Sequence, residues 1–215
     1  MNDVHSLRTE YCHATLDRAD VPSDPFDLFA AWFDDARKAG LVEPHAMALA
    51  TVDPDGSPSC RMVLLRGIAA AAGLDFYTNF DSRKGTALAH EPRAAATFWW
   101  GALERQVRFE GRVEAVPEAE ADAYFASRPR GSQLAAWASP QSAPIADRST
   151  LDARLAAVEA QFADAETVPR PPFWGGYRLV PHRIEFWQGR PSRTHDRLVF
   201  HGGPSKPWQI ERLAP

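Results

Sequence analysis

Short extended runs joined by turns fill residues 46–116, and this pattern constrains the fold more than any other feature of the chain. In one run, Val107, Phe109 and Val113 would lie on the same face of an extended chain, with polar residues between them. The sequence Asp53-Pro54-Asp55-Gly56 separates two other runs as a hairpin turn does. Strands joined by such tight turns pair antiparallel. The segment therefore predicts an antiparallel sheet.

A helix is expected before this sheet, over residues 24–40. Its signals lie at both ends, because Asp24 can cap the helix, Pro25 suits the first helical position and Gly40 suits the exit. Its apolar residues at spacing i, i+3, i+4, i+7 are Phe26, Phe29, Ala30 and Phe33.

The remaining segments complete a mainly β fold with α-helices. Strand runs separated mostly by short turns, with helices inserted, are typical of an antiparallel β-barrel with helical decoration, an α+β class. Residues 1–22 are polar and lack a sustained period, so we expect an N-terminal arm, and residues 23–215 should form a single domain. Further helices are expected at 82–90, 117–128 and 151–165, and further strands at 73–79, 92–100, 175–189, 197–200 and 207–213.

Charge and composition exclude several classes of protein. The chain has 24 basic and 28 acidic residues, a net charge of −4, which argues against a nucleic-acid partner. Its two cysteines, Cys12 and Cys60, have no CxxC spacing, so neither a disulfide framework nor a metal site is expected. The sequence has no secretory h-region and no apolar run near membrane-spanning length. We therefore expect a cytoplasmic protein without a membrane partner.

Two arginines flank the segment RMVLLR at residues 61–66. In a regular strand, side chains five positions apart point to opposite faces, so Arg61 and Arg66 could each serve a different anion. Taken alone, the motif fits two solvated arginines better.

The segment 77–85 passes from a strand into a helix through Ser82, Arg83 and Lys84. A helix N-terminus with free N–H groups, a hydroxyl and two cations suits a phosphate. Ordinary capping by Ser82 beside solvated cations is an equally good interpretation.

Tyr124 and Arg128 are four positions apart and so share a helical face, and Ser132 follows the break at Pro129, where it could cap the next helix. These groups could converge on one phosphate, although by themselves they fit a helix end with favourable arginines.

Basic groups also crowd the segment 193–197, where Arg193, His195 and Arg197 flank Asp196. Two guanidiniums and an imidazole repel one another unless they meet anions or a π-system, which favours a ligand-facing role.

Taken together, these segments resemble the pyridoxine/pyridoxamine 5′-phosphate oxidase family, with similarity from about Leu7 to Pro215. The sequences that carry the resemblance include FYTNFDSRKG, LERQV, SRPRGSQ, FWGGYR, IEFWQG, RTHDR and WQIERLAP. The resemblance implies a homodimeric split β-barrel with FMN at the subunit interface. It also implies an FMN-dependent pyridoxal 5′-phosphate synthase, which oxidises pyridoxamine 5′-phosphate or pyridoxine 5′-phosphate with O2 as electron acceptor.

The resemblance also assigns site residues. Arg193 and His195 would act on the substrate ring, and Arg61 and Lys84 would hold the FMN phosphate. The FMN site would comprise Arg61, Met62, Val63, Leu64, Leu65, Arg66, Tyr77, Thr78, Ser82, Arg83, Lys84, Gln106, Gln141, Ser142, Trp187 and Arg197. The substrate site would comprise Arg8, Tyr11, Arg66, Tyr124, Arg128, Ser132, Arg193, Thr194 and His195.

One position departs from the family pattern, since Arg66 stands where the family usually has lysine. Two alternatives stay open. One is a related flavin oxidase that acts on another ring, such as a phenazine precursor. The other is a split-barrel module that binds flavin or haem without turnover.

Overall fold

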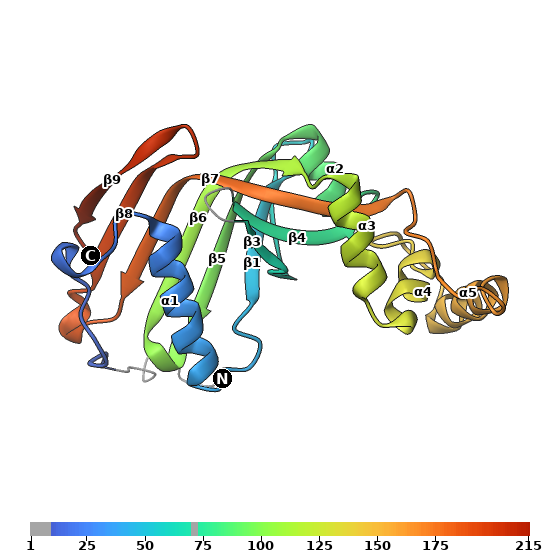
Figure 1. The fold of residues 1–215 in the computed structure, drawn as a ribbon, viewed down its shortest axis with the longest axis horizontal. Coiled ribbons are helices and arrows are strands. Elements are labelled where there is room, and N and C mark those ends of the chain that lie inside the picture. Colours follow the sequence, from blue (N-terminus) through green and yellow to red (C-terminus); the bar gives the residue numbers. More distant parts are fainter. Residues whose placement is uncertain (1–9, 70–72) are drawn as a thin grey trace.

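A computed structural model describes residues 10–69 and 73–215 of the chain, and within them it forms one antiparallel sheet with five α-helices (Figure 1). The strands are β1 (Ala46–Val52), β2 (Pro58–Leu64), β3 (Gly67–Ala69), β4 (Gly73–Asn79), β5 (Arg93–Trp100), β6 (Arg105–Ala115), β7 (Trp174–Gln188), β8 (Asp196–Gly203) and β9 (Lys206–Leu213). The helices are α1 (Pro25–Lys38), α2 (Arg83–His90), α3 (Glu118–Ser127), α4 (Arg130–Ala138) and α5 (Arg148–Gln161). This architecture confirms the mainly β fold with helical decoration.

The long strand β7 organises the sheet. The order is β2-β1-β5-β6-β7-β4-β3, and β8 also pairs with β7 and carries β9. One edge of β7 therefore serves two strands, with β4 opposite residues 174–179 and β8 opposite residues 183–188. Between these stretches lies Pro181, which has no N–H to donate and which pairs with Gly111 beside a bulge in β7, where the register skips His182. The sheet thus divides at Pro181.

The main core lies between α1 and one face of the sheet. Asp24 caps α1 by accepting from the Phe26 N–H at 2.9 Å, as the sequence predicts. Phe29 is fully buried and packs against Phe98 and Phe109, with ring centroids 5.1 and 5.0 Å away. The predicted apolar stripe was wrong at Ala30, which is exposed. The buried face is instead centred on Phe29 and continues through Leu28, Trp32 and Ala36.

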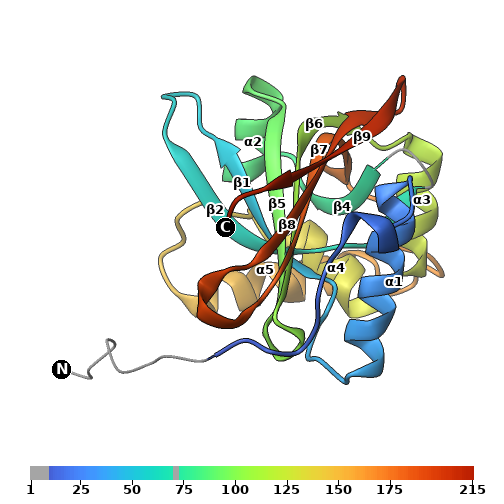
Figure 2. The same ribbon diagram turned by 90° about the vertical axis from the view of Figure 1, so that its left-hand side faces the viewer.

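The N-terminal segment is more closely packed than its polar composition suggests. Leu16 is only 5% exposed and belongs to the main core. Its backbone N–H donates to Asp196 at 3.1 Å and its carbonyl accepts from Arg212 at 3.0 Å. Figure 2 shows this blue segment running beside β8 and β9 on its way to α1. Residues 10–22 are thereby attached to the two C-terminal strands.

A smaller apolar cluster joins α3, α4 and α5 to the far end of β7 (Figure 1). The predicted helix at 151–165 begins earlier, at Arg148, because Asp147 accepts from the Thr150 N–H at 2.9 Å, and it ends at Gln161. None of the helices in the described part of the chain has the length and apolar character needed to cross a membrane.

The close contact at the sheet division gives a stability prediction. A Cβ on Gly111 would lie 2.1 Å from the carbonyl oxygen of Val180, whereas one on Gly131 in α4 would meet nothing within 4 Å. Gly111→Ala should destabilise the protein by roughly 1–3 kcal/mol through overpacking. The matched control Gly131→Ala should be neutral or stabilising by up to about 1 kcal/mol. Urea unfolding measures both, and equal midpoints would contradict the account.

Candidate active site

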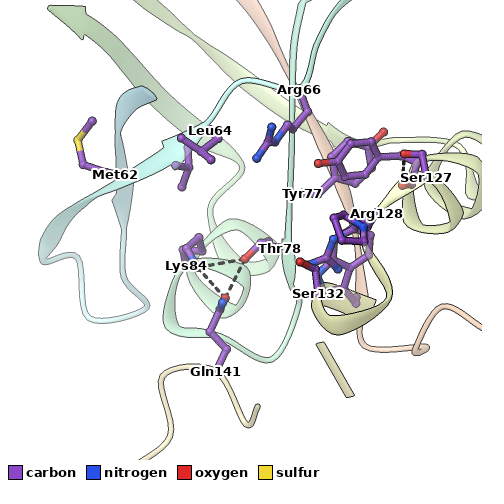
Figure 3. Close-up of a pocket in the computed structure, with 14 residues that line it drawn as sticks. Met62, Leu64, Arg66, Tyr77, Thr78, Lys84, Ser127, Arg128, Ser132 and Gln141 are labelled. Carbon is purple, nitrogen blue, oxygen red and sulfur yellow. Dashed lines mark hydrogen bonds between the residues drawn. The ribbon is translucent and has the colours of Figure 1, made fainter. Parts of the chain in front are cut away.

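A cavity of about 540 Å³ lies where β2 and β4 meet α2 and the α3–α4 junction (Figure 3). Cations lie at both sides of it, and aliphatic and aromatic residues lie between them. Its lining residues are Met62, Val63, Leu64, Arg66, Tyr77, Thr78, Lys84, Tyr124, Ser127, Arg128, Pro129, Ser132, Gln141 and Trp174. Most residues predicted to bind the two phosphates therefore meet in one place.

One side of the cavity is built around Lys84, in the first turn of α2. Its ammonium donates to Gln141 Oε1 at 2.8 Å and to Thr78 Oγ1 at 3.0 Å, and the Thr78 hydroxyl donates to the same amide oxygen (Figure 3). Burial lowers the pKa of Lys84, and the nearby charge of Arg61 lowers it further. A partly desolvated ammonium beside a second cation is stabilised by an anion.

Ser82 and Ser142, both predicted to bind FMN, lie next to this group in the chain but do not line the cavity. Ser82 is buried and caps α2, since its oxygen accepts from the Gly85 N–H at 3.3 Å. Capping and anion binding were alternatives for this motif, and the structure shows the capping bond directly. Ser142 follows Gln141 in an exposed loop and has a left-handed backbone, with φ of 71°.

Two predicted phosphate ligands point elsewhere. Arg61 donates to the Leu49 carbonyl at 3.0 Å and to the hydroxyl oxygens of Thr51 and Ser59 at 2.8 and 2.6 Å. Arg83 forms an ion pair with Asp53, in the β1–β2 turn, through both Nε and Nη2. Neither lines the cavity, so of the three cations near the start of α2 only Lys84 does.

Arg66 reaches the cavity for a different reason from the one predicted. Strand β2 ends at Leu64, so the alternation that placed Arg61 and Arg66 on opposite faces stops before Arg66. The Arg66 N–H instead donates to the Asp75 carbonyl at 2.8 Å, and the side chain enters the cavity from this connection. Leu65, also predicted to contact FMN, is buried in the core.

The other side of the cavity is built around Arg128, which ends α3. Its guanidinium lies 4.7 Å from the Trp174 ring and 5.4 Å from the Phe125 ring. Burial lowers the pKa of Arg128; the phenol of Tyr124 acts in the opposite direction, and the charge of Arg66 lowers it further. Its Nη1 is buried and has no hydrogen-bond partner among the described residues. A buried N–H without an acceptor is costly, so this atom marks a position for an anionic ligand.

Aromatic stacking fixes the wall beside Arg128. Tyr77 and Tyr124 stack with centroids 3.9 Å apart, and Trp174 stacks on Tyr77 at 5.5 Å. Ser132 also lines the cavity, but from within α4, whose N-cap is Pro129, so the predicted capping role was wrong. Trp174 was missed as a site residue. Its signal was the FWGGYR segment directly after a proline-rich break, where a long strand begins.

Three further predicted residues, Gln106, Trp187 and Arg197, lie with Trp99, which was not predicted, in a row across the sheet on the face opposite α1. Trp99 pairs with Gln106, Gln106 with Trp187, and Trp187 with Arg197, so these side chains share one face of β5 to β8. The rings of Trp99 and Trp187 are 6.0 Å apart, and Trp99 is 52% exposed. An exposed tryptophan on a sheet face is a typical interface residue. We call Trp99, Gln106, Trp187 and Arg197 the sheet row.

His195 packs at the end of this row. Its ring lies 4.5 Å from the Trp187 ring and 5.7 Å from the ring of Tyr11, and its Nδ1 accepts from the Arg190 N–H at 3.1 Å. A neutral imidazole has one N–H, so this bond places the proton on Nε2. Burial lowers the pKa of His195, and the charge of Arg193 lowers it further, which favours the neutral ring.

Arg193 and Thr194 form the exposed turn before His195. Arg193 has a left-handed backbone with φ of 61°, and both side chains are open to solvent. Arg8, the remaining predicted substrate residue, lies outside the described residues. Tyr11, another predicted substrate residue, contacts His195 edge to face.

The cavity and the sheet row are separate within one chain. Trp174 lines the cavity and Trp187 belongs to the row, and they stand thirteen residues apart on β7, which is roughly 40 Å of extended chain. None of the residues of the row, nor His195, lines the cavity. One chain therefore presents two incomplete halves of the predicted site.

Comparisons with known proteins give this arrangement a context. Residues 33–162 match the family model described as pyridoxamine 5′-phosphate oxidase, and residues 174–215 match the pyridoxine 5′-phosphate oxidase C-terminal dimerisation region. Over the full length of both chains, the sequence is 55% identical to a pyridoxine/pyridoxamine 5′-phosphate oxidase of Ralstonia pickettii. It is 54% identical to one of Burkholderia thailandensis, again over the whole of both chains.

Solved structures show the same fold. PhzG from Burkholderia lata, in complex with tetrahydrophenazine-1-carboxylic acid, is similar with a TM-score of 0.85 and 33% identity over 94% of this chain and 98% of that one. An FMN-binding protein from Nostoc punctiforme, related to pyridoxamine 5′-phosphate oxidase, matches with a TM-score of 0.71 and 18% identity over 91% of this chain and all of that one.

The environment of His195 predicts how it titrates. Protonation would put a hydrogen on Nδ1, against the Arg190 N–H, and a positive charge beside Arg193. In ¹⁵N-histidine-labelled protein, His195 should carry its proton on Nε2 at neutral pH and should titrate below the ordinary histidine pKa. Arg193→Ala should raise that pKa. A neutral ring with its proton on Nδ1 would contradict the hydrogen bond on which the prediction rests.

Proposed function

This chain belongs to the pyridoxine/pyridoxamine 5′-phosphate oxidase family and its cofactor is FMN, and on that premise we propose that it oxidises pyridoxamine 5′-phosphate and pyridoxine 5′-phosphate to pyridoxal 5′-phosphate. O2 accepts the electrons. The amine substrate also consumes water and releases ammonia, and each turnover yields hydrogen peroxide. The observation that carries this choice of substrate is the unpartnered Nη1 of Arg128 beside Arg66, which provides a second anion site in addition to that of the cofactor.

The cavity fits two phosphates. We assign the Lys84 side, with Thr78 and Gln141, to the FMN phosphate, and Arg61 supports it through its charge rather than by lining the cavity. The Arg128 side, with Arg66, Tyr124 and Ser132, takes the substrate phosphate. On each side the charge of a second cation lowers the pKa of the first, Arg61 for Lys84 and Arg66 for Arg128, and a bound dianion would offset this repulsion. Met62, Val63 and Leu64 also line the cavity, from β2.

The sheet row completes the site from a second copy of the chain. Its residues are separate from the cavity of their own chain. Trp187 lies on β7, and Gln106 and Arg197 pair with it from the neighbouring strands β6 and β8. Trp187 and Arg197 fall within residues 174–215, which match the dimerisation region. In the proposed homodimer, the row of one subunit lies against the flavin ring held by the other, and Arg193 and His195 approach the substrate.

When bound, FMN would supply the two-electron oxidant for removal of a hydride from the C4′ carbon of the substrate, with O2 as the final electron acceptor. The protein orients the reactants. Arg193, exposed on its turn, holds the substrate ring, and His195 donates a hydrogen bond from Nε2 to a substituent on that ring. Because Nδ1 is already occupied, neutral His195 has no lone pair free to act as a base, so its role is positioning.

The similarity to PhzG supports a second candidate, an FMN-dependent oxidase of a phenazine precursor. Such a ring acid carries a carboxylate instead of a phosphate ester. The pair Arg66 and Arg128, with Tyr124 and Ser132, suits a phosphate better, because it offers two cations and two hydroxyls to a dianion. We therefore favour the phosphorylated B6 substrates.

Oxygen uptake tests the proposed reaction. Purified protein should be yellow, should release FMN rather than FAD on denaturation, and should consume O2 with pyridoxamine 5′-phosphate. Steady uptake with a dihydrophenazine carboxylic acid and none with either phosphorylated B6 substrate would favour the second candidate. Bound flavin without turnover of any of these would indicate a binding module.

Substitution of Arg66 tests whether the two phosphate sites are distinct. Arg66→Ala should raise KM for pyridoxamine 5′-phosphate about ten- to a hundred-fold, the effect of losing a charge-assisted hydrogen bond, and should leave kcat and FMN affinity nearly unchanged. Arg66→Lys should be much milder because the charge remains. Unphosphorylated pyridoxamine is the control, since it has no phosphate to lose. If Arg66→Ala weakened FMN binding and left KM unaltered, the assignment of the two sides would be reversed.

A further inference from the structure

Glu185 is a buried carboxylate in the middle of the sheet face that carries the sheet row. It lies on β7, two positions before Trp187, and its side chain is 1% exposed. Its Oε1 accepts from Arg197 Nε at 2.8 Å and lies 2.8 Å from Arg197 Nη2 in an ion pair, and its Oε2 accepts from Arg183 at 3.0 Å and Arg108 at 3.5 Å. Both oxygens are thus used by guanidinium groups. A carboxylate this buried is tolerated only with such partners.

We propose that Glu185 is a positioning residue that fixes the guanidinium of Arg197 for binding the flavin. The inference rests on the proposed function, which places Arg197 and the rest of the sheet row against FMN. Glu185 itself does not touch the cofactor in this account; it acts through Arg197.

The hydrogen bonds of Arg197 show how this works. A guanidinium has five N–H groups. On Arg197 the Nε–H donates to Glu185 Oε1, Nη2 lies 2.8 Å from the same oxygen in an ion pair, and one N–H on Nη1 donates to the Ala214 carbonyl at 3.0 Å. These contacts hold the plane of the group from two directions. The remaining N–H groups, one on each Nη, have no acceptor among the described residues and are available to an acceptor on a ligand.

The dependence on Glu185 is specific to Arg197. Arg108 and Arg183 each have a second carboxylate, because both also form ion pairs with Glu110. Arg197 has no other carboxylate partner within residues 10–69 and 73–215, only the Ala214 carbonyl. Loss of the Glu185 charge should therefore leave Arg108 and Arg183 paired while it releases Arg197.

Glu110 provides a matched control. It lies on the neighbouring strand β6, belongs to the same group of charges and contacts Arg108 and Arg183, but it does not contact Arg197. Glu185→Gln and Glu110→Gln each remove one negative charge from this sheet face. They differ in whether the lost charge holds Arg197.

The experiment is titration of apoprotein with FMN, followed by flavin fluorescence, for both glutamine variants, for Glu185→Asp, and for each change combined with Arg197→Ala. Light scattering on the FMN-loaded proteins establishes that the compared variants share one assembly state. Glu185→Gln should weaken FMN binding on the order of ten-fold, since a neutral amide loses the charge and keeps only one acceptor oxygen for the three guanidinium groups. Glu110→Gln should change it much less. Glu185→Asp should recover part of the loss because the charge returns.

The double variants decide whether Glu185 acts through Arg197. In the Arg197→Ala background, Glu185→Gln should have no further effect on FMN affinity. Equal losses in Glu185→Gln and Glu110→Gln, or an undiminished loss in the Arg197→Ala background, would overturn the inference. If Arg197→Ala alone left FMN affinity unchanged, the contact of Arg197 with flavin would be wrong, and the inference with it. The proposed reaction would still be judged separately by oxygen uptake.

Discussion

The sharing of β7 between two partner strands is the constraint on which the rest of the structure depends. A strand edge can satisfy only one neighbour at each residue, so β4 and β8 divide it at Pro181, the residue that cannot donate to either. Gly111 makes the division possible, because its missing side chain lets β6 approach the Val180 carbonyl at the bulge. The same division sends Trp174 to the cavity and Trp187 to the sheet row, which explains why one chain carries its two functional surfaces apart.

Electrostatics then distinguishes the two surfaces. Around the cavity, like charges act on one another: Arg61 lowers the pKa of Lys84, and Arg66 lowers the pKa of Arg128. On the sheet face, by contrast, the arginines are interleaved with Glu110 and Glu185. Like charges held together in a partly buried cavity favour an anionic ligand, whereas paired charges favour fixed geometry. The first surface is therefore built for binding, and the second for orientation.

Much of this could be predicted from the sequence, because local signals determine it. Alternation identified the strands, and Asp24 and Ser82 marked helix starts that the structure confirms. Predictions failed where tertiary contacts decide. Ala30 has helical spacing but faces solvent, since the sheet contacts the Phe29 side of the helix. Arg83 and Lys84 are adjacent in the sequence and were both predicted to bind phosphate. Arg83 instead forms an ion pair with Asp53 in the β1–β2 turn and does not line the cavity. No local pattern could indicate that the Trp174 ring, at the start of β7, would contact the guanidinium of Arg128 at the end of α3.

The cations of the cavity make ligand binding sensitive to the inorganic anions in solution. Charges that are already gathered before a ligand arrives do not distinguish a phosphate ester from a free inorganic oxyanion until the rest of the molecule makes contact. Inorganic phosphate and sulfate present the same charged oxygens, so they should compete with the proposed organic phosphates for these positions. Apparent affinities for cofactor and substrate will consequently depend on the choice of buffer ion, and selectivity must come from the aromatic and aliphatic walls between the two charged ends.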